Sequence, residues 1–420
     1  MNSVDYYSIN QRDTYRLVEN LTSKRFKSEL SLLKSLVKDI VSQDKFEING
    51  GRIWELLPEQ NAYILRFQYG NVKRIPTGYT MQVTDHPALT NLAKKRASLH
   101  YETDELLKKK GIELYSVAGV GELIKLKSGK YYKYALGFNA PQILQSFYET
   151  LIIISNVATI ALRNQRWYAE QKLIRQDILK ASEIQKNLLP DHYLEFRDYK
   201  IFGVCVPDQY VGGDYFDYLK PADDESERVG IVISDAASKG LPAAIQALFV
   251  SGAIRMGMAF ASRISALLSR INSLIFETFP YERFVTLFYC ELTSSSNGLV
   301  LYANAGHCAP IHYCNEDGSI ELLKQTGGLL GIMQNQKITV ENISMKKGDV
   351  LVMFTDGIIE ARNNQGEFFT TQRVAEVVQS KSEESAETIA YSILEEVQKF
   401  SSGSIHNDDK TIVVIKRDKE

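Results

Sequence analysis

The stretch VISDAASKGLPAA, residues 232–244, ends an apolar run in a carboxylate, Asp235, and continues through small residues into a helical pattern. An Asp in a tight turn or at a strand end, beside small residues, occurs at three other places in the C-terminal half of the chain. They are VGGDYFDY with Asp214, VMFTDGIIEA with Asp356, and HNDDKTIVVI with Asp408 and Asp409. A carboxylate at the end of an apolar strand lies at the rim of a core. Four such carboxylates from distant parts of the chain could form an all-oxygen site for hard divalent cations.

Spacing alone does not decide between this site and four unrelated turns, because Asp and Gly are ordinary turn residues. Gly212, Gly213 and Gly357 suit the site, since glycine lets the backbone approach an ion closely. The histidines and cysteines at 307, 308, 312 and 314 form a second cluster. Its spacing matches no standard zinc pattern, so we do not expect zinc there.

The chain has 420 residues, enough for two or three domains, and its 44% hydrophobic and 24% charged residues are typical of a folded protein. A net charge of -2 gives no field to attract nucleic acid or an anionic membrane. Four cysteines without a C-x-x-C pair fit a reducing compartment. The N-terminus lacks the features of a signal peptide, and the most apolar stretch, 150–162, is too short to span a membrane. We therefore expect a soluble, cytoplasmic protein.

The region 199–420 is rich in short β-type runs. Strands are predicted at 201–206, 229–234, 284–292, 299–303, 338–343, 350–354 and 411–415. Helices are predicted at 243–260, 264–279, 372–380 and 386–400. Helices clustered between groups of strands predict an α+β layered domain, not a regular βαβ repeat.

The N-terminal region has a different pattern. Apolar residues at helical spacing predict amphipathic helix over 13–44. Strand-like runs follow at 52–57, 62–69, 112–117 and 122–126, which indicates a small mixed α/β domain.

A long helical pattern then begins near Pro141 and continues to Leu189, where Pro190 can end it. Steps of three and four residues define a seam of Val157, Ile160, Asn164, Trp167, Gln171, Ile174, Ile178, Ala181, Gln185 and Leu188. This repeat predicts a coiled coil, and hence a homodimer, whose amides fix the register at some cost in stability. The alternative is a lone helix packed on its own domain, because periods of 3.5 and 3.6 residues differ little over this length.

From about residue 174 to the end, the chain resembles the SpoIIE/RsbU-type branch of the metal-dependent protein Ser/Thr phosphatases, with the protein phosphatase 2C-like fold. The resemblance rests on seven motifs in family order: ASEIQKNLLP, VGGDYFDY, VISDAASKGLPAA, NAGHCAP, TGGLLGI, FTDGIIEA and DDKT. It implies a β-sandwich flanked by helices, with two Mn²⁺ or Mg²⁺ ions at one end. Two such ions activate a water for attack on phosphorus, so no protein nucleophile is required.

Taken residue by residue, the resemblance implies that Asp235 bridges both ions and that the carbonyl of Ala236 completes the shell of one. Further carboxylates come from Asp214, Asp356 and Asp408. Asp217 and Asp409 are either outer residues of the site or solvated turn acids. Ser238 stands where the family usually has Gly, which puts the conformation of this loop in question.

The first 165 residues resemble a GAF domain, from their order of helix and strands and from the region 111–151. GAF domains commonly bind a small molecule or dimerise. All four cysteines lie beyond residue 200, which excludes a covalently bound bilin. The predicted organisation is a GAF-like sensor at 1–156, a helical coiled-coil linker at 157–190 and a phosphatase domain at 191–420.

The resemblance implies a phosphoserine/phosphothreonine protein phosphatase in bacterial-type signalling, regulated by the sensor through a dimeric helical linker. Family members often act on a phosphorylated anti-sigma-factor antagonist of the STAS type. One alternative is a catalytically silent module that holds a signalling partner, and the intact carboxylates argue against it. A nucleotide cyclase is a more distant alternative, weakened because the sequence has no identifiable base-reading constellation.

Overall fold

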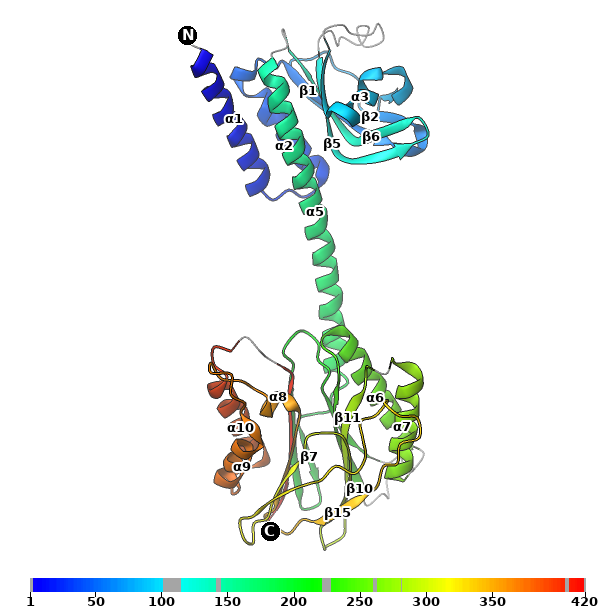
Figure 1. The fold of residues 1–420 in the computed structure, drawn as a ribbon, viewed down its shortest axis with the longest axis vertical. Coiled ribbons are helices and arrows are strands. Elements are labelled where there is room, and N and C mark those ends of the chain that lie inside the picture. Colours follow the sequence, from blue (N-terminus) through cyan, green and yellow to red (C-terminus); the bar gives the residue numbers. More distant parts are fainter. Residues whose placement is uncertain are drawn as a thin grey trace. The chain divides into compact units, whose positions relative to one another are not determined.

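A computed structural model describes residues 3–100, 115–140, 145–220, 228–259, 263–280, 282–404 and 408–418. The chain divides into two compact units, Met1–Ile174 and Arg175–Glu420. One long helix, α5 (Gln145–Lys186), begins in the first unit and continues into the second (Figure 1). Whether residues 157–190 act as a separate linker stays a prediction.

The first unit contains an antiparallel sheet of order β3-β2-β1-β6-β5-β4. Its strands are β1 (Gly50–Leu57), β2 (Ala62–Gly70), β3 (Thr80–Gln82), β4 (Ala97–His100), β5 (Tyr115–Leu126) and β6 (Gly129–Asn139). The helices with it are α1 (Ser3–Ser23), α2 (Glu29–Val41) and α3 (Pro87–Lys95), with short 3₁₀ turns at Asp44–Phe46, Pro58–Gln60 and Val83–Asp85.

Alternation along β1 gives this sheet two apolar faces. Ile53 belongs to a core shared with α1, α2 and the start of α5. Trp54 and Leu56 belong to a second core on the other face, together with Leu92 of α3. Successive side chains of a strand point to opposite faces, so one strand supplies both cores.

Two expectations for this unit were wrong in detail. The single helical region predicted over 13–44 is two helices, separated at residues 24–28, where the Ser28 side chain accepts a hydrogen bond from Ser31 N and caps α2. The strand predicted at 122–126 is the end of one long strand, β5, whose register shifts between Val120 and Leu123. Gly121 takes a φ of 91° at this irregularity, which glycine allows at little cost. Residues 112–114 of the other predicted strand lie outside the described residues.

The second unit contains two antiparallel sheets, of order β15-β12-β11-β10-β9 and β14-β13-β16-β17-β8-β7. The first is built from β9 (Tyr215–Leu219), β10 (Arg228–Ala236), β11 (Val285–Thr293), β12 (Leu299–Ala305) and β15 (Glu341–Ser344). The second is built from β7 (Tyr193–Phe196), β8 (Tyr199–Val206), β13 (Ile311–Tyr313), β14 (Ile320–Leu322), β16 (Val350–Phe354) and β17 (Lys410–Arg417). The helices are α6 (Leu241–Ala259), α7 (Ile264–Thr278), α8 (Asp356–Ile359), α9 (Thr370–Lys381) and α10 (Ala386–Phe400).

These elements stack in four layers, with α6 and α7 on one outer side and α9 and α10 on the other (Figure 1). Ile231 and Ile233 of β10 pack between the sheets, together with Val413 of β17. The intervening Val232 instead contacts the core under α6 and α7, and Val414 the core under α9 and α10. The expected sandwich flanked by helices is therefore confirmed.

The sequence prediction missed the short strands β7, β9, β13 and β14 and the single-turn helix α8. Among the described helices, α6 alone is long and apolar enough to cross a membrane, at Leu241–Met258. Only 44% of that window is buried, yet Val250 and Ile254 are fully buried in the core of the unit, as in an ordinary core helix.

Gly203 of β8 packs tightly against β9 of the other sheet, since an added Cβ would lie 2.3 Å from Phe216 and 2.5 Å from the Tyr218 hydroxyl. We predict that Gly203→Ala lowers the free energy of unfolding by about 1–3 kcal/mol through overpacking. The control is Gly252→Ala on the exposed face of α6, where an added Cβ meets nothing within 4 Å. That substitution should raise stability by about 0.5–1 kcal/mol. Urea unfolding measures both, and equal effects would contradict the close packing of the sheets.

Candidate metal centre

Asp214 lies in the last position before β9 and is 3% exposed. Its Oδ2 accepts hydrogen bonds from Thr355 Oγ1 and Thr411 Oγ1, each at 2.7 Å. Thr355 directly follows β16 and Thr411 lies near the start of β17. The second sheet thus fixes the orientation of a carboxylate that the first sheet supplies.

Asp235 and Ala236 end β10, opposite Thr286 and Val285 of β11. The Ala236 carbonyl accepts a hydrogen bond from Ser238 N at 2.6 Å, and an added Cβ on Gly213 would lie 3.2 Å from the same oxygen. Because a carbonyl oxygen has two lone pairs, Ala236 keeps the capacity to bind an ion as well.

Asp356 is the first residue of α8, and Asp408 and Asp409 directly precede β17. Asp409 accepts hydrogen bonds from Asp208 N at 2.8 Å and Gly213 N at 2.7 Å, so it holds the glycine loop in place. An added Cβ on Gly357 would lie 2.0 Å from the Asp409 carbonyl oxygen. Gly357 is therefore required for the close approach of these two segments.

The carboxylates act on one another electrostatically. Burial raises the pKa of Asp235, and it is raised further by the charges of Asp214, Asp356, Asp408 and Asp409. Burial also raises the pKa of Asp214, against the opposing effect of its two threonine hydrogen bonds. The pKa of Asp356 is raised by burial first and by neighbouring carboxylates second. A cluster of buried carboxylates that resists ionisation is complemented by hard divalent cations, which prefer oxygen ligands.

One cation of the chain lies at this cluster and was not predicted. Lys239 Nζ contacts Asp408 Oδ2 at 2.6 Å, with side chains 67% and 44% exposed. The hydrogen bond to Asp408 raises the pKa of Lys239, so the amine stays protonated. The rim of the cluster is therefore open to solvent and carries a positive charge beside its carboxylates.

His307 contacts Thr286, the residue that pairs with Asp235 across β10 and β11. Its Nδ1 lies 2.9 Å from Thr286 Oγ1, and its backbone N donates to Asn304 Oδ1 at 2.8 Å. Burial lowers the pKa of His307 to about 4, so the ring is neutral at physiological pH. These contacts agree with a structural role for the NAGH turn.

Asp217 does not belong to the cluster. It is neither an outer residue of the metal site nor a solvated turn acid. It is 2% exposed and accepts hydrogen bonds from Tyr215 OH and, at 2.6 Å, from Arg255 Nε. Asp217 follows Asp214 by three positions along an extended segment, so the two side chains point to opposite faces of the sheet. The partner on α6 is 38 positions away in the sequence, which no local pattern indicates.

The Ser238 loop is not strained. Ser238 is absent from the positive-φ residues, while Gly240, two positions later, has a φ of 67°. The Ser238 hydroxyl donates to Gln246 Oε1 at 2.9 Å, and Gln246 Nε2 donates to the Arg283 carbonyl. Ser at the usual Gly position therefore fixes the loop to α6 without a backbone cost.

The histidine and cysteine cluster separates in the structure. Among the described residues, His312, Cys314 and Asp349 place possible metal-binding atoms within 4.8 Å of one another. Asp349 is already occupied, since it accepts from Asn315 N, Lys346 N and His312 Nε2. The hydrogen bonds of Asp349 to Asn315 N and Lys346 N stabilise the local turns, and this structural role explains the arrangement.

Comparison with known proteins supports the resemblance of the second unit. Residues 225–418 match the family model for stage II sporulation protein E, SpoIIE. Phosphoserine phosphatase RsbU of Bacillus subtilis is 26% identical over 247 residues, covering 59% of this chain and 72% of RsbU. Protein IcfG of Synechocystis sp. is 28% identical over 270 residues, covering 58% of this chain and 42% of IcfG.

Among solved structures, the SiaA-PP2C domain of Pseudomonas aeruginosa superposes with a TM-score of 0.51 at 19% identity. The match covers 60% of this chain and 99% of that domain. It shows that the second unit shares the PP2C fold. The family model begins at residue 225, so the GAF resemblance of the first unit stays a prediction.

The raised carboxyl pKa values predict how stability depends on pH without metal. An unfolded Asp ionises near its ordinary pKa of about 3.9, whereas the folded cluster holds its protons to higher pH. Between the ordinary pKa of Asp and the raised pKa values of the folded cluster, the unfolded state binds fewer protons than the folded state. The free energy of unfolding therefore falls as pH rises through this range. In EDTA, the free energy of unfolding should therefore fall between about pH 5 and about pH 8, and Asp235→Asn should reduce this slope.

Urea unfolding at several pH values measures the slope. Asp317→Asn, which changes a carboxylate in the turn between β13 and β14, is the control and should leave the slope unchanged. If Asp235→Asn and Asp317→Asn give the same slope as the unchanged protein, the electrostatic account of the cluster is wrong.

Proposed function

We propose that this protein is a serine/threonine phosphatase that dephosphorylates a signalling protein by using two divalent cations, because residues 225–418 match the SpoIIE family model and the second unit shares the PP2C fold. The observation that carries this proposal is the environment of Asp235, whose pKa is raised first by burial and then by the charges of Asp214, Asp356 and Asp408. A silent binding module would have no need of this excess of buried negative charge.

The residues that would hold the ions are Asp214, Asp235, Asp356 and Asp408, together with the Ala236 carbonyl. Mn²⁺ or Mg²⁺ held there would lower the pKa of a water and would neutralise charge on the phosphoryl oxygens. The threonine hydrogen bonds fix Asp214, and Asp409 fixes the glycine loop beside it. Lys239 places a positive charge at the rim, where a phosphoryl group enters.

The substrate proposed is a phosphoserine or phosphothreonine on a protein. The open rim supports this, because a phosphate carried on a polypeptide needs access from solvent. RsbU is named a phosphoserine phosphatase, which supports phosphoserine for this chain as well. We assign the partner to the STAS-type antagonists of anti-sigma factors, and the location to the cytoplasm, by the same resemblance.

The end of α5 provides a route for regulation. Gln185 Nε2 donates to the Gly212 carbonyl at 2.7 Å, and Gly212 N donates back to Gln185 Oε1 at 3.1 Å. Arg255 Nη2 donates to the Leu188 carbonyl just beyond the helix. Any shift of α5 therefore moves the glycine loop that precedes Asp214.

In the middle of α5, several apolar side chains are exposed. Trp167, Leu173 and Ile174 are 55%, 62% and 53% exposed. A second copy of α5 would cover Trp167 and Ile174, which are seam residues, and this supports a dimeric coiled coil. The coiled coil would connect a small-molecule sensor in the first unit to the phosphatase domain.

Removing the bridging carboxylate tests the catalytic proposal. Asp235→Asn should lower Mn²⁺-dependent phosphate release from a phosphoserine protein by at least about 100-fold, because it removes charge from the centre of the site. Asp408→Asn should be less severe and Asp409→Asn milder still. Asp317→Asn is the matched control and should keep full activity. Full activity of Asp235→Asn with Mn²⁺ would contradict the assignment of Asp235 to the metal site.

Two amides of the predicted seam separate the roles of the helix. Gln185→Leu should lower turnover, since it breaks both hydrogen bonds to Gly212. Gln171 is an exposed residue on the same seam, so Gln171→Leu should tighten the dimer without lowering turnover. Sedimentation and kcat are measured for each variant. A monomer at micromolar concentration, or equal kcat values for both variants, would contradict this account of regulation.

A further inference from the structure

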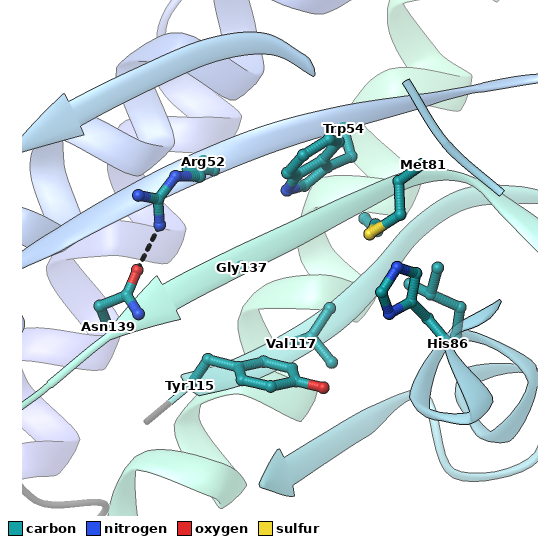
Figure 2. A pocket seen from close by; sticks show the side chains of 10 residues that line it. Arg52, Trp54, Met81, His86, Tyr115, Val117, Gly137 and Asn139 are labelled. Carbon is teal, nitrogen blue, oxygen red and sulfur yellow. Dashed lines mark hydrogen bonds between the residues drawn. The ribbon is translucent and has the colours of Figure 1, made fainter. Parts of the chain in front are cut away.

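A cavity of about 50 Å³ lies on the face of the first unit's sheet that also packs against α3. It is lined by Arg52, Trp54, Met81, His86, Leu89, Tyr115, Val117, Ala135, Gly137 and Asn139. Figure 2 shows Arg52 and Trp54 on the same strand, with Met81 and His86 toward one end and Tyr115 and Val117 below. The cavity is therefore a feature of one unit alone and does not depend on the second.

Arg52 is the charged residue of this cavity, and it is 2% exposed. Nη1 donates to Asn139 Oδ1 at 2.6 Å (Figure 2). Nη2 donates to the Lys73 carbonyl at 2.9 Å, so both acceptors are neutral. Nε is buried and has no hydrogen-bond partner. A guanidinium has five N–H donors, so two contacts leave the group well short of saturation.

No carboxylate of the described residues forms an ion pair with Arg52. The nearby charge that acts on it is another cation, Arg74, whose side chain is exposed. Burial lowers the pKa of Arg52 to about 10, which still leaves it protonated at neutral pH. A buried charge is costly unless an opposite charge compensates it. The fold therefore retains a cation that needs an anion.

The other walls define the rest of the ligand. Trp54, Met81, Leu89 and Val117 present apolar surface, with aromatic rings from Trp54 and Tyr115. Gly137 lies beside Arg52 in the register of β1 and β6, and the nearest atom to an added Cβ there is Trp54 Nε1 at 4.0 Å. A larger side chain at this position would project into open space, so glycine keeps the floor of the cavity free.

We propose that this cavity binds a small organic monocarboxylate with a compact apolar or aromatic body, and that Arg52 supplies the counter-charge for its carboxylate. A single negative charge matches the single buried cation, whereas a phosphate dianion would leave excess charge among apolar walls. The inference deepens the sensor role assigned to the first unit in the proposed function, by naming the class of ligand. It does not depend on phosphatase activity.

The test uses the full-length chain with benzoate as the probe and benzamide as its neutral counterpart. Trp54 and Trp167 are the chain's two tryptophans, so a Trp167→Phe background leaves Trp54, within the cavity, as the reporter. Benzoate should change the Trp54 fluorescence in a saturable manner and bind at least about tenfold more tightly than benzamide, because only benzoate pairs with the guanidinium. Isothermal titration gives the same affinities independently.

Two substitutions in the cavity and one outside it complete the design. Arg52→Met should weaken benzoate binding at least about tenfold and remain folded, since it removes an uncompensated buried charge. Gly137→Leu leaves Arg52 in place but fills the cavity, and should abolish binding of both probes. Arg74→Gln removes a neighbouring exposed cation and should bind benzoate as the unchanged protein does.

Equal affinity for benzoate and benzamide, unchanged benzoate binding by Arg52→Met, or no saturable response to benzoate would each overturn the proposal. Tighter binding of phenyl phosphate than of benzoate would overturn the carboxylate assignment. If Arg52→Met fails to fold, the Gly137→Leu and benzamide comparisons still decide the outcome. Phosphate release is measured on the same samples, so the failure of ligand binding and the failure of the phosphatase proposal are seen separately.

Discussion

Repulsion among the aspartates at one end of the sandwich is the constraint on which the second unit depends. Burial and mutual charge raise the pKa of Asp214, Asp235 and Asp356, so these side chains resist ionisation where they lie. The surrounding fold nevertheless holds them in place, through two threonine hydroxyls on Asp214 and a glycine loop secured by Asp409. A fold that keeps acids together at a cost in stability is explained when cations complete the site.

The first unit presents the opposite case in the same chain. Arg52 is a buried cation with neutral partners, beside a cavity with apolar walls. In both units the proposed ligand would compensate buried ionisable groups. The helix α5 extends from one unit into the other, and its Gln185 contacts the loop before Asp214. The regulation proposed here would act through this contact between α5 and the loop before Asp214.

Local patterns predicted much of the second unit, because alternating apolar residues and terminal Asp residues report directly on strands and on their ends. They did not reveal Thr355 and Thr411 as partners of Asp214, since threonine in or next to a strand is ordinary. The Asp217–Arg255 ion pair was missed because it joins residues that only the tertiary fold brings together. Strands of three or four residues, such as β7 and β13, carry too little periodicity to be recognised. For the first unit, the break between α1 and α2 depends on one capping serine.

A crystal grown with Mn²⁺, with anomalous diffraction measured at the manganese edge, tests the central claim most directly. The account predicts two anomalous peaks per chain on either side of the Asp235 carboxylate, with Asp214, Asp356 and Asp408 around them. Peaks of this kind should disappear in Asp235→Asn. Manganese found elsewhere, for example between His312 and Cys314, with none at Asp235, would contradict the claim that the clustered aspartates form the catalytic metal site.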